Sequence, residues 1–103
     1  MKYFAVHYQY ADESPEIVAL RSVHREWLAT LGAADQLVGS GPYTDGQGGA
    51  LIVIRLPETA TVSDAEELMD EDPFSREKAL KGRSIREWNP VLNVFRSPDE
   101  DLN

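Results

Sequence analysis

One segment of the chain, residues 50–54, is apolar at five consecutive positions and constrains the fold more than any other. An antiparallel sheet with one face in water alternates apolar and polar residues along each strand, and this segment does not alternate. We therefore predict a strand over residues 50–56, closed by Pro57, that needs dry cover on both faces. Helices of the same chain can cover one face, so we expect a homodimer packed sheet to sheet to cover the other. The alternative is that the final segment of the chain shields the outer side chains.

Local signals mark the other elements. Aromatic and β-branched residues predict a first strand over residues 2–10. Ser14 and Pro15 suit the cap and the first residue of a long helix that Gly32 ends. Next we predict a glycine-interrupted strand at 35–42 and a flexible connection at 43–49. After the strand at 50–56 we predict a helix at 63–71, opened by a capping box of Ser63 and Glu66, and a short helix at 74–80 stopped by Gly82. The last strand is predicted at 85–95, with an edge or bulge at Pro90.

This order of elements is β-α-β-β-α-β with a small helical insertion before the last strand. It predicts an α+β fold of the ferredoxin-like type, in which both helices lie on one face of an antiparallel sheet. A length of 103 residues supports one domain with one core. We place that domain at residues 1–95 and expect residues 96–103 to form a polar C-terminal tail.

The charge balance argues against several classes of partner. Eighteen acidic residues against ten basic ones give a net charge of −8, which repels nucleic-acid backbones and anionic lipid. No apolar run approaches the roughly 20 residues of a membrane-spanning helix, and the N-terminus lacks the apolar stretch of a signal peptide. The chain has no cysteine, and its two histidines lack metal-binding spacing. We therefore expect a cytoplasmic protein without a metal site, whose partner is neither a nucleic acid nor a membrane.

His24 suggests chemistry because it occupies a position in an otherwise apolar helical stripe. The stripe consists of Ile17, Leu20, His24, Trp27 and Leu31. A buried imidazole without a hydrogen-bond partner costs about 1–3 kcal/mol, so His24 needs a partner. The structural alternative is a core histidine bonded to a backbone carbonyl. The other histidine, His7, is expected to line the open face of the sheet.

Asp72 is the partner that we expect for His24. A carboxylate bonded to an imidazole fixes its tautomer and raises its pKa, which makes it a better general base. The alternative role is structural, since an Asp before a Pro is a good helix cap, and Asp72→Asn should then leave stability nearly intact. Arg21, one turn before His24, is either an anchor for an anion or oxyanion, or half of a salt bridge with Glu13 or Glu26.

A glycine-rich strand end is a candidate pocket floor. Ser40 lies between two glycines, and Gly41 and Pro42 follow it. We interpret the segment as a place where the Ser40 hydroxyl and backbone N–H groups contact a ligand oxygen. The plainer interpretation is a strand that enters a turn. The connection at 43–49 lacks the pattern of a phosphate-binding loop and is either a mobile connector or a lid.

Four short motifs occur in a distinctive order and spacing. They are Arg21-Ser22-Val23-His24, Gly41-Pro42, Asp72-Pro73-Phe74 and Pro90-Val91-Leu92-Asn93-Val94-Phe95. Together they resemble the YciI-like (YCII-related) family. The resemblance implies a dimeric ferredoxin-like α+β barrel with a pocket in which His24 and Asp72 are an acid/base pair. We expect the substrate-binding residues of that pocket to be Arg21, Ser40, Gly41, Pro42 and Phe74.

Relatives of this family include lyases and isomerases that act on small ring compounds. We therefore expect a cofactor-independent enzyme in which His24, oriented by Asp72, moves a proton on a small polar or aromatic substrate. Arg21 or Ser40 would stabilise an oxyanion, and the outcome would be elimination or isomerisation. Two other functions remain open: a small-ligand-binding or accessory homodimer without turnover, and a cofactorless monooxygenase, since this type of barrel also carries that activity.

Overall fold

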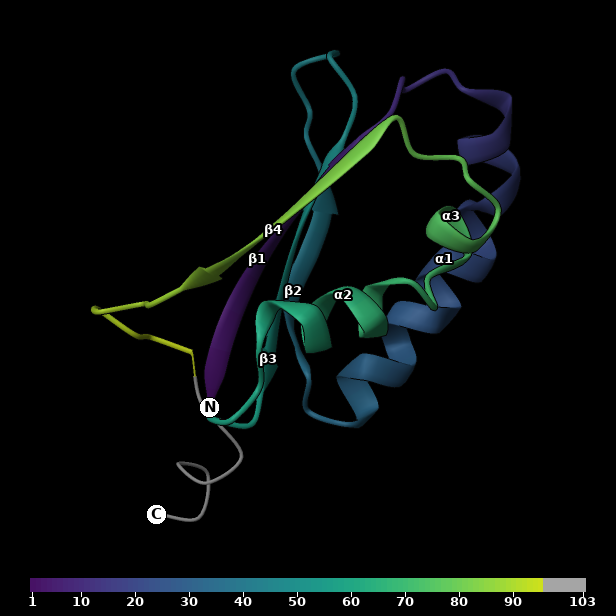
Figure 1. Cartoon of the computed structure of the whole chain (residues 1–103). Coiled ribbons are helices and arrows are strands. Elements are labelled where there is room, and N and C mark those ends of the chain that lie inside the picture. The colour runs from purple at the N-terminus through teal and green to yellow at the C-terminus, as the bar shows by residue number, and fades with distance from the viewer. Residues whose placement is uncertain (96–103) are drawn as a thin grey trace.

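Four strands form one antiparallel sheet in the computed structural model, which describes residues 1–95 (Figure 1). Residues 96–103, which we predicted to form a polar tail, lie outside the described part of the chain. The strands are β1 (Lys2–Gln9), β2 (Leu37–Pro42), β3 (Ala50–Leu56) and β4 (Gly82–Trp88), and they lie in the order β2-β3-β1-β4. Every neighbouring pair is antiparallel. The predicted ferredoxin-like α+β fold is therefore confirmed.

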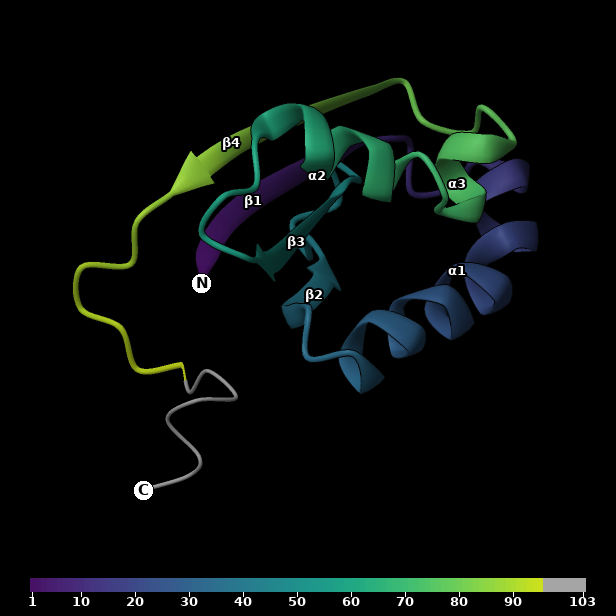
Figure 2. The same ribbon diagram turned by 60° about the horizontal axis from the view of Figure 1, so that its bottom comes forward.

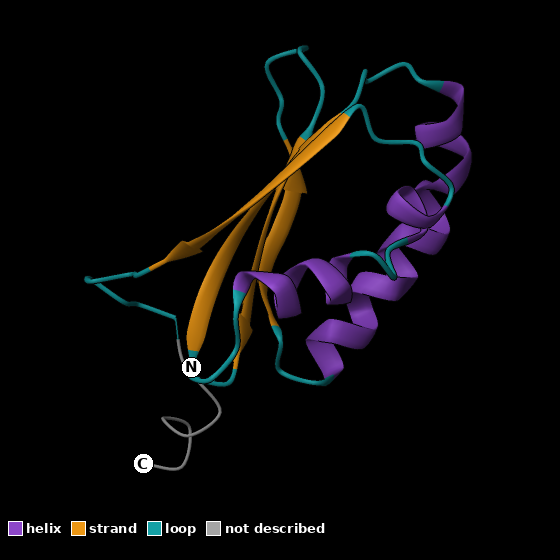
Figure 3. Cartoon of the chain, in the orientation of Figure 1, coloured by secondary structure: helices purple, strands orange, loops and turns teal. Residues whose placement is uncertain are grey.

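All three helices of the described chain lie on one side of this sheet (Figure 3). They are α1 (Pro15–Ala33), α2 (Val62–Met69) and the single turn α3 (Pro73–Arg76). The core fills the space between the helices and the sheet. Its fully buried side chains include Phe4 and Val6 from β1, Ile52 and Ile54 from β3, and Ile17, Ala65 and Met69 from the helices. Within residues 1–95, no helix is long and apolar enough to cross a membrane.

The predicted stripe of α1 is correct in part. Ile17, His24 and Leu31 are buried, whereas Leu20 and Trp27 are only half-buried and Leu28 takes a buried position instead. Residues 17, 24, 28 and 31 lie along one line of a helix with 3.6 residues per turn, so the contact stripe is narrower than we predicted.

We had predicted that α1 ends at Gly32. In the structure the helix includes Gly32 and ends at Ala33. Asp35 takes the left-handed conformation that follows the helix, with φ of 60°. Aspartate tolerates this conformation better than most residues other than glycine.

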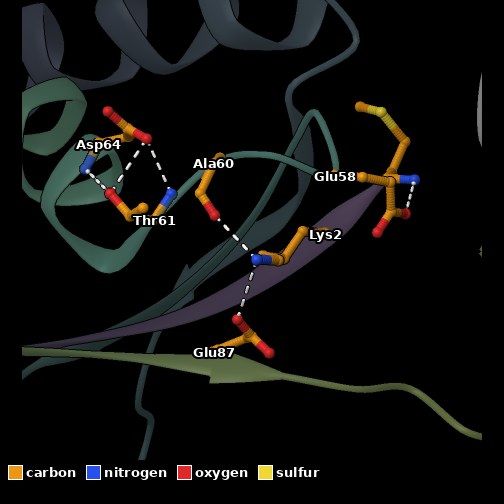
Figure 4. A network of polar contacts seen from close by, with 7 residues as sticks. Lys2, Glu58, Ala60, Thr61, Asp64 and Glu87 are labelled. Atoms are coloured by element: carbon orange, nitrogen blue, oxygen red, sulfur yellow. Dashed lines mark hydrogen bonds and ion pairs between the residues drawn. The ribbon is translucent and has the colours of Figure 1, made fainter.

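The capping box of α2 also differs from our prediction. Thr61, not Ser63, is the N-cap: its hydroxyl accepts from the Asp64 backbone N–H at 3.2 Å, and Asp64 accepts from the Thr61 N–H at 2.8 Å (Figure 4). An aspartate thus fills the position that we assigned to Glu66. In the same view the Lys2 ammonium donates to the Ala60 carbonyl at 2.9 Å, which ties β1 to the start of α2.

The last two elements are displaced from the predicted positions. The helix predicted at 74–80 is only α3, which begins at Pro73 and ends at Arg76; Lys78 then has φ of 57°. The strand predicted at 85–95 is β4, which begins at Gly82 and ends at Trp88. Trp88 pairs with Tyr3 near the first residue of the antiparallel strand β1, so β4 ends where its partner strand begins.

The outer face of the sheet, opposite the helices, is partly covered by the end of the chain. Leu51 and Val53 of β3 point to this face and are half-buried. After β4 the chain leaves the sheet edge and loops back (Figure 2), and Phe95 lines an apolar groove with both residues. Asn93 also donates to the Tyr3 hydroxyl at 3.3 Å. The final segment thus shields one part of the face, and the predicted homodimer stays a prediction.

Candidate active site

His24 and Asp72 lie against each other, although 48 positions separate them in the sequence. The imidazole Nδ1 is 2.9 Å from both carboxylate oxygens of Asp72. The buried line of α1 carries His24, which is 8% exposed, and the start of α3 carries Asp72, which is fully buried. The packing of α3 against α1 brings the two side chains together.

Asp72 is also the N-cap of α3 and the acceptor for a tyrosine. Its Oδ1 accepts from the backbone N–H of Phe74 at 3.0 Å, and its Oδ2 accepts from the Tyr8 hydroxyl at 2.6 Å. The carboxylate therefore has three donors, and this satisfies an anion that has no contact with water. The cap and the contact with His24, which we had weighed as alternatives, occur together.

Tyr8 keeps its proton in this arrangement. Burial of the ring raises the pKa of the Tyr8 hydroxyl well above its ordinary value, and the negative charge of Asp72 and the hydrogen bond to it raise the pKa further. Tyr8 thus remains a donor to Asp72 throughout the physiological range. The sequence analysis had not assigned Tyr8 a role in the site.

The tautomer of His24 follows from these contacts. An ionised Asp72 only accepts hydrogen bonds, so Nδ1 of His24 is the donor and Nε2 keeps its lone pair when the ring is neutral. Nε2 has no hydrogen-bond partner among residues 1–95. In the same range, every fully buried side-chain nitrogen or oxygen has a hydrogen-bond partner. Nε2 is therefore accessible to solvent. The Phe74 ring stacks on the imidazole with centroids 3.9 Å apart and an angle of 10°, which fixes the plane of the ring.

A cavity of about 190 Å³ lies beside His24 between α1, α3 and the β2–β3 side of the sheet. Asp72 lies behind the imidazole and does not line it. The cavity brings together the expected substrate-binding residues with several others: its lining consists of Tyr10, Arg21, His24, Arg25, Leu28, Ser40, Gly41, Pro42, Ala50, Ile52 and Phe74.

The cavity is cationic although the chain is acidic. Arg21 and Arg25 line it, and no acidic residue within residues 1–95 does. Neither arginine forms an ion pair within the described chain, so the salt bridge of Arg21 with Glu13 or Glu26 is not observed. Arg25 was missed in the sequence analysis, although its position four residues after Arg21 on the same helix was a usable signal.

The second histidine lies away from this cavity. The Nδ1 atom of His7 is 2.8 Å from the Tyr43 hydroxyl, and the two rings stack with an angle of 11°. Tyr43 begins the connection at 43–49, whose Gly48 and Gly49 have positive φ and approach the backbone carbonyls of Tyr10 and Tyr8 closely. This connection packs on the end of β1.

Comparison with known proteins adds a family and a set of similar folds. The family model of the YCII-related domain matches residues 1–89. No curated protein matches the chain. The solved structure of 5-chloro-2-hydroxyhydroquinone dehydrochlorinase (TftG) from Burkholderia phenoliruptrix AC1100, in complex with 2,5-dihydroxybenzoquinone, has a TM-score of 0.69 and 16% identity, over 84% of this chain and 93% of that one.

Two further solved structures are similar. An antibiotic biosynthesis monooxygenase has a TM-score of 0.57 and 11% identity, over 88% of this chain and 99% of the other. Protein Atu4242 from Agrobacterium tumefaciens has a TM-score of 0.57 and 16% identity, over 95% and 98%. At such identities the similarity establishes a shared fold, and function has to be argued from the site itself.

Proposed function

The chain belongs to the YCII-related domain family, and from that membership and the geometry of the cavity we propose that it is a cofactor-independent lyase or isomerase acting on a small polar or aromatic molecule. His24 is the general base and acid, and Asp72 positions it. The observation that carries the proposal is the contact of Nδ1 with a fully buried carboxylate, beside a cavity that the same ring lines.

The geometry supports one direction of proton transfer. Nε2 takes a proton from the substrate, and the imidazolium that forms is stabilised by Asp72 through Nδ1. Negative charge then develops on a substrate oxygen, where Arg21 or Ser40 stabilises it. In an isomerisation the imidazolium returns the proton to another substrate atom. In an elimination a leaving group departs with its bonding electron pair.

A solved structure of the same fold supplies the first probe for this reaction. The first test substrate is 5-chloro-2-hydroxyhydroquinone, with chloride release as the measurement, because the protein of that structure is a dehydrochlorinase. A panel of other single-ring hydroxy and keto compounds, followed by exchange of carbon-bound hydrogen with D₂O, extends the search. With any compound that reacts, His24→Gln should lower kcat by roughly 10²–10⁴-fold, the usual contribution of general acid–base catalysis.

The matched control for this test is His7→Gln, because His7 does not line the cavity. It should keep the full rate. Turnover that survives in His24→Gln would refute the role of His24.

A second candidate function is a non-catalytic small-ligand-binding or accessory homodimer. The hydrogen bonds of Asp72 to Phe74 and Tyr8 favour it, because they give the buried carboxylate a structural role that needs no reaction. On this view His24→Gln changes ligand affinity and no compound of the panel reacts. The monooxygenase alternative has only the similarity of fold in its support.

In either function we propose a homodimer joined through the outer faces of two sheets. The half-buried Leu51 and Val53 on β3 support this, together with Trp88 of β4, which is 39% exposed. A cytoplasmic location remains a prediction from the sequence.

A further inference from the structure

Two arginines face the cavity with no anion to compensate them. Arg21 and Arg25 lie one turn apart on α1, and neither has an ion-pair or side-chain hydrogen-bond partner within residues 1–95. Like charges at this spacing on a helix repel each other. The chain is acidic overall, yet none of the acidic residues in its described part lines this cavity. Both guanidinium groups are therefore available to an anionic group of a ligand in this cavity.

The size and the apolar lining of the cavity define the rest of the ligand. Its volume of about 190 Å³ is slightly more than the ~150 Å³ in which a protein cavity binds benzene. Apolar surface comes from Leu28, Pro42, Ala50, Ile52 and the Phe74 ring. Such a lining suits one six-membered ring with a few substituents, and it gives no cover to a longer chain.

We propose that the cavity binds a single-ring carboxylate, with the carboxylate held by Arg21 and Arg25 and the ring placed beside His24. Guanidinium groups match a carboxylate in shape and charge, and two of them exceed what one developing oxyanion requires. His24 lies between the arginines in the sequence and lines the same cavity, so the anchored ring lies next to Nε2. The inference deepens the proposed function by naming the class of substrate, and it assigns Arg25 as a binding residue.

Tyr10 is a further polar group at this end of the cavity. Burial raises the pKa of its hydroxyl, while the positive charges of Arg21 and Arg25 act in the opposite direction, and all three side chains line the same cavity. Asp12 is also near enough to affect Tyr10, but it does not line the cavity and forms no ion pair with either arginine. The Tyr10 hydroxyl remains a neutral donor beside the two charges.

The test compares two ligands of equal shape and different charge, benzoate and benzamide, by NMR titration of the ¹⁵N-labelled protein. We expect benzoate to bind with a Kd of roughly a millimolar, at least tenfold tighter than benzamide, and to shift amide signals around His24 and Ser40. Added salt should weaken benzoate and leave benzamide unchanged. Arg25→Gln should weaken benzoate roughly tenfold, since hydrogen bonds to charged groups are worth about that factor, and should not affect benzamide.

Arg76→Gln is the control, because Arg76 is an exposed arginine of α3 that does not line the cavity. It makes the same change of net charge and should leave both affinities unchanged. Thermal unfolding checks that both variants fold, which is expected because Arg25 is exposed.

Several results would overturn the inference. They are equal affinity for the two ligands, no binding of benzoate at concentrations far above a millimolar, and equal losses in Arg25→Gln and Arg76→Gln. None of these measurements needs turnover, so the binding inference and the proposed enzymatic function can each be refuted without refuting the other. Charge-selective binding without any reaction would support this inference and refute the proposed enzymatic function. A reaction on neutral rings with no preference for benzoate would refute this inference and support the enzymatic function.

Discussion

At the scale of single residues, the site depends on one carboxylate with three donors. The sequence indicated that His24 needed a partner and that Asp72 was available, because both signals are local: an interrupted apolar stripe and an Asp-Pro start. Strand alternation did not identify Tyr8 as the third donor, because it predicts the face of a side chain and not the contact of its hydroxyl. A buried tyrosine usually has a partner, however, and that rule was a usable signal.

The three donors change the expectation for Asp72→Asn, which the cap alone suggested would be nearly neutral. The asparagine oxygen can still accept from Phe74, but its amide N–H groups would meet Tyr8 and His24. We expect a loss of about 1–3 kcal/mol in the free energy of unfolding, measured by urea denaturation. The variant also favours the tautomer with the proton on Nε2, so kcat should fall by roughly 10⁴-fold. Unchanged activity would separate Asp72 from catalysis.

Tyr8→Phe is expected to change the dependence of stability on alkaline pH. Because the pKa of Tyr8 is higher in the folded protein than in the unfolded chain, the folded state holds this proton more tightly. The resulting stability is complete below about pH 10, where a free tyrosine ionises, and is lost as the pH rises above it. Urea unfolding between pH 8 and pH 11 should show a shallower alkaline decline in Tyr8→Phe than in the wild type. Equal slopes would mean that Tyr8 titrates like an exposed tyrosine.

At the scale of elements, the sequence predicted which helices and strands exist better than where they end. The order of elements needed only periodicity, caps and glycines. The end of β4 depends on β1, since Trp88 pairs with Tyr3 and little of β1 remains beyond it. The start of α2 was ambiguous because Thr61 with Asp64 and Ser63 with Glu66 fit the same cap pattern. In the structure Thr61 is the N-cap, and Ala65 and Met69 of this helix are buried in the core.

This ambiguity allows a matched pair of substitutions. Thr61→Ala removes the hydroxyl that accepts from Asp64 and should cost about 1 kcal/mol of stability. Ser63→Ala lies inside the helix and should change stability by only a few tenths of a kcal/mol. Thermal unfolding of the two variants provides the measurement. A larger loss of stability in Ser63→Ala than in Thr61→Ala would instead support the capping box of Ser63 and Glu66 that the sequence predicted.

At the scale of the whole molecule, the outer face decides whether the chain acts alone or in pairs. The apolar run at 50–54 correctly indicated a strand, but it could not say what covers the outer side, where Leu51 and Val53 are half-buried. The final segment covers part of that side through Phe95, while Val91, Leu92 and Val94 on the same segment are more than 80% exposed. Such exposure of large apolar side chains is typical of an interaction surface.

Val53→Glu tests the proposed homodimer. A charge in the middle of the outer face should convert the dimer to a monomer, because the carboxylate would have to be buried without a partner. Light scattering after gel filtration measures the mass. Val18→Glu is the control, since Val18 is 56% exposed on α1. A wild-type monomer would favour cover by the final segment alone.

The alternation of β3 has a consequence for how readily this protein can be altered. Ala50 and Ile52 border the cavity, and Leu51 and Val53 border the groove on the opposite side. Under the proposed function and the proposed homodimer, neighbouring residues of one strand therefore act on separate properties: positions 50 and 52 on ligand selectivity, and positions 51 and 53 on self-association. An engineer, or natural selection, can adjust either trait while leaving the other as it is.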